Sequence, residues 1–183
     1  MKQFPLVFAM GIFASAQLLS CAKSTAGSSG TLAHTHAEFE FRIDAGYEVV
    51  APLFGPEAER RWGGEHWDPE FLYPDTARDT TGAVFTVTHD GMKSTWVNTL
   101  LDMENGKVQY VCYLSGAVVT LININITKLS PAQTRVEVSY ERTALKPEAN
   151  DHVKVLGEND KGSGKEWAEA ITDCLKKEGK ISK

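Results

Sequence analysis

The sequence has 183 residues, which suits one domain, and its hydrophobic fraction of 42% is enough for a core without disulfides or metal. The net charge of −5 argues against nucleic-acid binding, because phosphate contacts come from lysine and arginine. We therefore expect a small, mildly acidic globular protein that does not bind nucleic acid.

The first segment is typical of an export signal. Lys2 precedes an uncharged apolar run, 4–13, that is shorter than the about 20 residues of a membrane-spanning helix. Ala14-Ser15-Ala16 offers one cleavage site, which would release a soluble product. Leu18-Leu19-Ser20-Cys21 resembles a bacterial lipobox, in which Cys21 is acylated and becomes the mature N-terminus. An uncleaved anchor is the third alternative.

Two features favour the lipidated form. Cys21 is the odd one of three cysteines and adjoins the apolar run, and the residues after it are small and polar, as in flexible tethers. We expect a signal peptide over 1–20, a tether over 21–31 with Cys21 as the lipidation site, and a folded domain over 32–183. The protein would then lie in the bacterial cell envelope as a membrane-anchored lipoprotein, or otherwise be periplasmic or secreted.

The first half of the domain predicts a strand followed by short helices. Residues 37–43 alternate, which puts Phe39, Phe41 and Ile43 on one face of a strand. The segment 47–62 predicts one or two short helices, because prolines and a Gly-Pro pair interrupt it. Residues 65–74 are aromatic, and their prolines limit them to an edge strand or an extended loop.

The middle of the chain predicts an antiparallel meander. Strands are expected over 83–89, 93–102, 107–115, 118–129 and 135–143, with Asp90-Gly91 and Asn105-Gly106 as hairpin turns. The turns are too short for crossovers. Alternation places Ile122, Ile124 and Ile126 on one face, with Asn123 and Asn125 facing solvent. It also groups Trp96, Asn98 and Leu100 on one face of their strand.

A terminal helix is predicted to cover the sheet. Trp167, Ile171 and Leu175 recur at helical spacing within 166–178, as do Ala170 and Cys174, and form an apolar stripe. The preceding segment, 147–164, is polar and partly helical. The fold class is therefore α+β. Cys112 and Cys174 could pair in an oxidising compartment, and the sequence leaves this open.

Several strings in this order resemble the START-like superfamily, also called SRPBCC. They are Pro52 to Trp62 (PLFGPEAERRW), Trp67-Asp68-Pro69-Glu70, Gly82 to Thr86 (GAVFT), Trp96-Val97 and Thr134 to Tyr140 (TRVEVSY). The resemblance covers roughly 36–178 and points to an uncharacterised bacterial branch of the superfamily. It implies a helix-grip fold: about six to seven strands curve around a long C-terminal helix, with two short helices after the first strand. It also implies an apolar cavity, but no reaction, since fold alone does not give function.

We expect ligand contacts from the aromatic residues and from the polar residues near them. In a helix-grip fold, some members of the aromatic set must line the cavity. The candidate pocket residues are Trp62, His66, Trp67, Phe71, Phe85, Trp96, Tyr110, Tyr140 and Arg142. An inward-pointing Asn98 would cost free energy unless it is paired, and would therefore mark a polar handle for a ligand.

Catalytic and metal patterns are weak. No phosphate loop, dinucleotide pattern, nucleophile elbow or HExxH motif is present, and we expect no cofactor and assign no catalytic residue. His66 with Glu65 or Asp68 could act as a general base if the three converge inside the cavity. His34 and His36 lie two apart on a strand and could approach one metal ion, but zinc needs more ligands. We do not assign a metal site.

Three functions remain open. The first is binding of a small hydrophobic or lipid-like ligand, which a cavity under about 300 Å³ would disfavour. The second is an envelope interaction module without a ligand, which a large exposed apolar patch would favour. The third is a cyclase- or hydrolase-like enzyme built on the region of His66. The sequence favours the first function, with a small hydrophobic ligand as partner and a membrane reached only through Cys21.

Overall fold

The computed structural model describes residues 30–89 and 91–182. The predicted signal peptide, nearly all of the tether, Cys21 and Asp90 lie outside the described residues. Within the described residues, no helix is long and apolar enough to cross a membrane.

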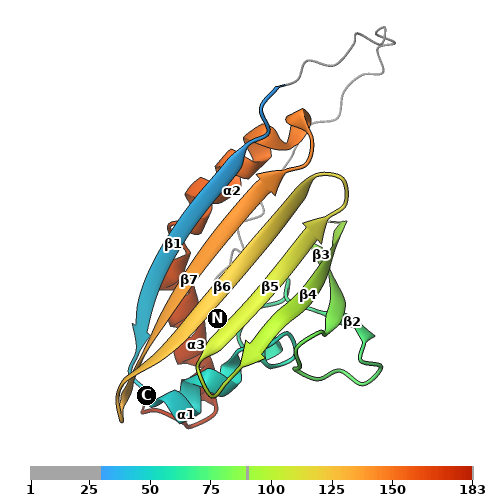
Figure 1. The fold of residues 1–183 in the computed structure, drawn as a ribbon. Helices are drawn as coiled ribbons and strands as arrows, with labels where there is room; N and C mark the ends of the chain where they lie inside the picture. The colour runs from blue at the N-terminus through green and yellow to red at the C-terminus, as the bar shows by residue number, and fades with distance from the viewer. Residues whose placement is uncertain (1–29, 90, 183) are drawn as a thin grey trace, which may run out of the picture.

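A seven-stranded antiparallel sheet forms the main layer (Figure 1). Its order is β1-β7-β6-β5-β4-β3-β2, so strands β2 to β7 form a meander and β1 closes beside β7. The strands are β1 His34–Ile43, β2 Glu70–Tyr73, β3 Val84–His89, β4 Met92–Asp102, β5 Lys107–Leu114, β6 Val118–Ser130 and β7 Gln133–Ala144. The predicted meander is confirmed, and the segment expected at an edge supplies the edge strand β2.

Helices cover one face of this sheet. In Figure 1, α2 and α3 run behind β1 and β7, and α1 lies at one end of the sheet. The helices are α1 Tyr47–Val50, η1 Ala51–Leu53, η2 Ala58–Arg61, η3 Pro147–Ala149, α2 Asn150–Asp160 and α3 Ser163–Lys177, where η denotes a 3₁₀ helix. The predicted helix-grip architecture is confirmed. The C-terminal helical region is longer than its apolar stripe indicated, and it is divided into two helices.

Alternating side chains build the core as the sequence predicted. Ile122, Ile124 and Ile126 of β6 are buried, whereas Asn125 is exposed and Asn123 half-buried on the outer face. On other strands, Phe41, Val108 and Val138 are buried on the same inner face.

A β-bulge in β4 reverses the predicted alternation. The pairing with β5 shifts register between Asn98 and Leu100, so Leu100 pairs with Gln109 and Leu101 with Val108. Leu101 therefore packs against the core, and Leu100 is exposed on the outer face. The prediction that Leu100 shares a face with Trp96 and Asn98 is wrong, because the bulge inserts one residue into the strand.

A buried ion pair fastens α2 to the sheet. Arg142 of β7 donates from Nε to Oδ2 of Asp160 at 2.6 Å and from Nη2 to Oδ1 at 2.8 Å. Its Nη1 donates to Oγ1 of Thr120 at 3.0 Å, and its guanidinium lies 4.7 Å from the centre of the Tyr140 ring. Because this fork engages both carboxylate oxygens, it fixes the end of α2 to β7.

Both cysteines of the described domain are free thiols. Burial raises the pKa of Cys112 to about 12, and the Cys174 thiol donates to Oε1 of Glu178 at 3.6 Å. The pairing that the sequence left open is therefore not formed in this structure.

Replacing Asp160 by alanine should destabilise the domain by about 3–5 kcal/mol, because it leaves the Arg142 guanidinium buried without a counter-charge. Urea unfolding monitored by tryptophan fluorescence measures the change. Glu158→Ala is the matched control, since Glu158 pairs with Lys161 in solvent and its loss should cost less than about 1 kcal/mol. Equal losses for the two variants would contradict the assigned role of the buried pair.

Candidate functional site

A tight turn directs the side chain of Glu59 into the interior. The carboxylate of Asp79 accepts hydrogen bonds from the backbone N–H groups of Glu57 at 2.7 Å and Ala58 at 3.0 Å, which fixes the start of η2. Gly55 has a φ of 130°, and a Cβ there would lie 2.5 Å from Cγ of Asp79. The close approach and the positive φ both require glycine. As a result, the side chain of Glu59 points inward and the residue is only 2% exposed.

Glu59 meets Tyr110 inside the domain. The Tyr110 hydroxyl donates to Oε1 of Glu59 at 2.7 Å, and the N–H of Gly55 donates to the same oxygen at 3.2 Å. Burial is the main cause that raises the pKa of Glu59 to about 8, with Asp79 adding to it and the two hydrogen bonds opposing it. The carboxyl is therefore mostly protonated at neutral pH, as expected for a buried acid that has no cationic partner in the described part of the chain.

An interior cavity adjoins this pair. It has a volume of about 10 Å³ and is lined by Glu59, Trp67, Trp96, Tyr110, Ile122, Ile124, Tyr140 and Trp167. That is room for about one water molecule. The apolar cavity implied by the resemblance is therefore much smaller than the about 300 Å³ at the low end of ligand pockets, and its size counts against a preformed pocket.

The aromatic walls of the cavity are held by one another and by the backbone. Trp67 and Trp96 pack edge to face with centroids 5.3 Å apart, and Trp62 lies 5.1 Å from Trp167. The indole of Trp67 donates to the carbonyl of Pro56 at 3.0 Å. Such edge-on packing is favourable for aromatic rings, so the walls have defined positions.

Asn98 is a second buried polar group beside Tyr110. It is 0% exposed, it is the cross-strand partner of Tyr110, and neither its side-chain oxygen nor its nitrogen has a hydrogen-bond partner within the described residues. The sequence predicted that an inward Asn98 would mark a polar handle, and the structure places it inward. An unpaired buried amide costs about 1–3 kcal/mol.

The structure brings some of the predicted pocket residues together and separates others. Trp67, Trp96, Tyr110 and Tyr140 line the cavity. Phe85 packs on Trp96 and Phe71 packs on Phe85, one layer away. Trp62 packs on Trp167, and Arg142 forms an ion pair with Asp160. Neither Trp62 nor Arg142 lines the cavity.

His66 does not reach the interior. Glu65, His66 and Asp68 are all exposed, and the ring of His66 packs against His89 at 4.7 Å. Asp68 pairs with Arg60 on the surface. The hypothesis of a general base at His66 required these side chains to converge in the cavity, so the structure removes it.

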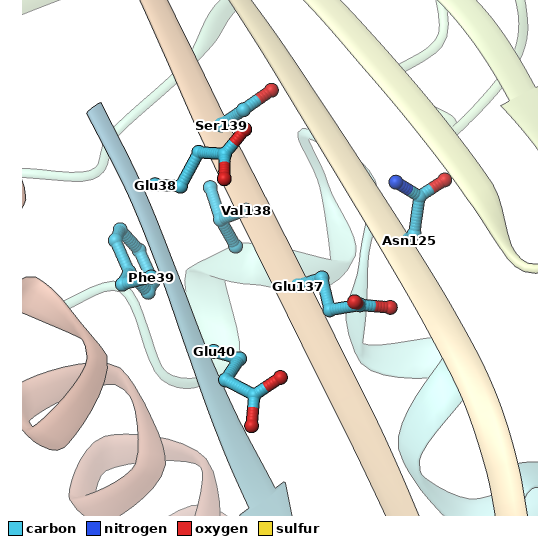
Figure 2. Close-up of a pocket in the computed structure, with 7 residues that line it drawn as sticks. All are labelled: Glu38, Phe39, Glu40, Asn125, Glu137, Val138 and Ser139. Atoms are coloured by element: carbon cyan, nitrogen blue, oxygen red, sulfur yellow. The ribbon is translucent and has the colours of Figure 1, made fainter. Parts of the chain in front are cut away.

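A larger groove lies on the outer face of the sheet. Figure 2 shows the carboxylates of Glu38, Glu40 and Glu137 standing over β1 and β7, with Asn125 on β6. The groove has a volume of about 360 Å³. Its acidic side chains are solvated, and the groove is formed by neighbouring side chains on a polar sheet face. It therefore has the character of an ordinary surface groove.

His34 and His36 share a carboxylate on this outer face. Glu141 accepts from Nε2 of His34 at 2.9 Å and from Nδ1 of His36 at 2.7 Å, and Nε2 of His36 lies 2.8 Å from Glu38. Hydrogen bonds to Glu38 and Glu141 raise the pKa of His36. The two imidazoles do lie on one face, but no metal-binding group of three such side chains occurs within the described residues.

The sequence reasoning missed Glu59 and did not assign Trp167 to the site. Glu59 sits in a charged run, 57–61, whose other acidic and basic members reach solvent or surface ion pairs. The only sequence signal was its spacing of three from Trp62, which places both on one side of a helical turn. Trp167 was predicted as part of the apolar stripe, and it also lines the cavity.

No model of a protein family matches the sequence, and no curated protein matches it. Solved structures do match. Norcoclaurine synthase from Thalictrum flavum, in complex with dopamine and hydroxybenzaldehyde, is similar with a TM-score of 0.59 at 16% identity, over 88% of this chain and 99% of that chain. A hypothetical protein from Helicobacter pylori has a TM-score of 0.63 at 8% identity, over 83% of this chain and 98% of its own.

A protein from Rhizobium leguminosarum is also similar, with a TM-score of 0.55 at 15% identity, over 80% of this chain and 97% of its own. At such identities the likeness concerns the fold alone. Together with the sheet order and the C-terminal helices, it shows that the chain has the helix-grip fold.

The pKa of Glu59 predicts a pH-dependent stability difference. The folded state holds a proton that the unfolded chain releases above pH 4.5, so this contribution to stability is complete below pH 4.5 and is lost as the pH rises through about 8. Glu59→Gln does not titrate. The original protein should therefore lose stability relative to the variant between pH 5 and 8. The difference in their free energies of unfolding should change by on the order of 1–3 kcal/mol in favour of the variant. Urea unfolding at several pH values measures it.

Glu57→Gln is the control, because Glu57 is half-exposed and pairs with Arg60. Its unfolding free energy should keep a nearly constant offset over the same pH range. A constant offset for Glu59→Gln as well would show that Glu59 is ionised in the folded state.

Proposed function

We propose that this protein is an exported binding protein that holds a small, largely apolar ligand between its sheet and its helices. The observation that carries the proposal is the buried acid Glu59 in an aromatic-lined interior, where it has a tyrosine partner and, among the described residues, no cationic one. Glu59 and Tyr110 would hold the polar end of the ligand, and the tryptophans would contact its apolar part.

The energetic cost of these polar groups supports a binding role. Glu59 must stay protonated to remain buried, and Asn98 leaves two polar atoms unpaired. Apolar side chains of similar size would give a more stable core. Buried ionisable groups with strongly shifted pKa values are typical of functional sites.

The small cavity means that a ligand must displace part of the cover. The seam between η2 and α3 is the best candidate for the opening. It is joined by the exposed ion pair of Arg61 with Glu178 and by the packing of Trp62 on Trp167. Exposed pairs contribute about 0–1 kcal/mol, so the ion pair opposes opening only weakly.

The solved relatives are compatible with this proposal. Norcoclaurine synthase, which has the same fold, is seen in complex with dopamine and hydroxybenzaldehyde, both small aromatic molecules. The fold can therefore accommodate ligands of this size. The likeness supports a small ligand here and does not extend to the reaction of that enzyme.

An interaction module without a ligand is the second candidate. A row of apolar side chains, Val84, Val97, Val111 and Leu121, crosses the outer face of the sheet through consecutive strand pairs. Leu100 and Tyr113 are exposed beside it. A docking role predicts that changes on this face, and not at Glu59, abolish function.

Export and lipidation belong to the same proposal. The apolar run at 4–13 and the lipobox-like string ending in Cys21 support a membrane anchor at Cys21, in the bacterial envelope. Such an anchor would hold the folded domain next to the membrane through the tether over 21–31.

Native mass spectrometry tests the bound ligand. The full chain, processed by its bacterial host and purified gently, should carry extra mass that disappears on denaturation and appears in an organic extract. Glu59→Gln should lower the occupied fraction about tenfold or more, because it removes the ionisable group of the site. Glu40→Gln, on the outer face, is the matched control and should keep the ligand. Purified protein that carries no extra mass would contradict the proposal.

Metabolic labelling with a fatty acid tests the anchor. The original protein should be labelled and should sediment with membranes, whereas Cys21→Ala should be unlabelled and soluble, because it lacks the acylated thiol. A mature N-terminus at Gln17, found by mass spectrometry of the N-terminal peptide, would show that the protein is released as a soluble product.

A further inference from the structure

The interior site combines an acid without a counter-ion and a set of aromatic rings. Within the described residues, no lysine or arginine forms an ion pair with Glu59, and the buried Arg142 is held by Asp160 through both carboxylate oxygens. Three tryptophans and two tyrosines line the cavity with Glu59. Among the residues that the structure describes, the site therefore offers hydrogen-bond acceptors and aromatic rings and has no positively charged side chain.

We infer that the ligand of this site is a small organic cation, bound by the carboxylate of Glu59 and by the rings of Trp67, Trp96 and Trp167. The inference rests on the binding function proposed above and specifies its ligand class. Aromatic faces attract cations, and tryptophan does so most strongly. A carboxylate that is buried with an opposite charge is no longer unpaired, so the ligand would supply the missing partner.

A neutral ligand would not be attracted by both the carboxylate and the aromatic rings of the site. A carbonyl or hydroxyl could bond to Tyr110 and to the protonated carboxyl, but it would gain little from three tryptophans beyond apolar contact. A cation would instead engage the rings and the acid together. The two ligand classes differ in one measurable respect, because only the cation requires Glu59 to lose its proton.

The groups that face Glu59 set the pH dependence. They are Tyr110 on β5, Tyr140 on β7 and Asp79 in the loop before β3, while α3 contributes Trp167 at the cavity. Burial raises the pKa of both tyrosines far above neutral pH. Glu59 is therefore the group of the site that changes charge between pH 6 and 8.

The test uses a permanently charged probe, benzyltrimethylammonium, and a neutral alcohol of nearly the same shape, 2-methyl-1-phenyl-2-propanol. Isothermal titration calorimetry of the full-chain protein at pH 6, 7 and 8 measures both affinities. The affinity for the cation should rise about tenfold per pH unit up to about pH 8, with release of one proton. Glu59→Gln should weaken it about tenfold or more and abolish the pH dependence, whereas Glu57→Gln should preserve both.

The outcomes separate the two proposals. If the alcohol binds as tightly as the cation, or if cation binding does not change with pH, the site takes neutral ligands and the cation inference is overturned. If neither probe binds and the protein isolated from its host carries no ligand, the proposed binding function fails as well. Cation binding that survives in Glu59→Gln would place the cation elsewhere and also overturn the inference.

Discussion

The need to cover the inner face of a wide sheet determines most of this structure. Seven strands present one continuous apolar face, but α2 and α3 pack mainly against β1 and β7 at one side. The inner face of β3 to β5 must therefore be covered by the short helical segment between β1 and β2. Phe54, Trp62 and Trp67 supply that cover, and all three are buried. An exposed apolar face of this extent would not be stable in water.

Glu59 lies inside because of how that covering segment is built. The Asp79 carboxylate fixes the start of η2 through two backbone N–H groups, and the turn at Gly55 then directs Glu59 towards β5. Tyr110 meets it there at 2.7 Å. The same segment thus supplies both apolar cover and a polar group, and a change in the Asp79 contacts would disturb the two together.

The sequence predicted the fold from alternation and turn signals, and it failed where local geometry departs from a regular period. The isoleucines of β6 and the apolar stripe of α3 lie as expected, because each follows the period of its element. The bulge in β4 has no such signal and exchanges the faces of Leu100 and Leu101. Glu59 lies in a 3₁₀ turn of four residues, which is too short for a periodicity to reveal which side chain is buried.

The closed interior also limits how tightly any ligand can bind. Opening the seam between η2 and α3 separates Trp62 from Trp167 and exposes apolar surface, and this cost is subtracted from the affinity of the open form. The unpaired atoms of Asn98 and the protonated Glu59 act in the opposite direction, because they destabilise the closed form relative to one in which they are solvated or bonded to a ligand. The polar groups of the interior therefore reduce the free energy needed to open it, which links the cost of burying them to the function proposed for the site.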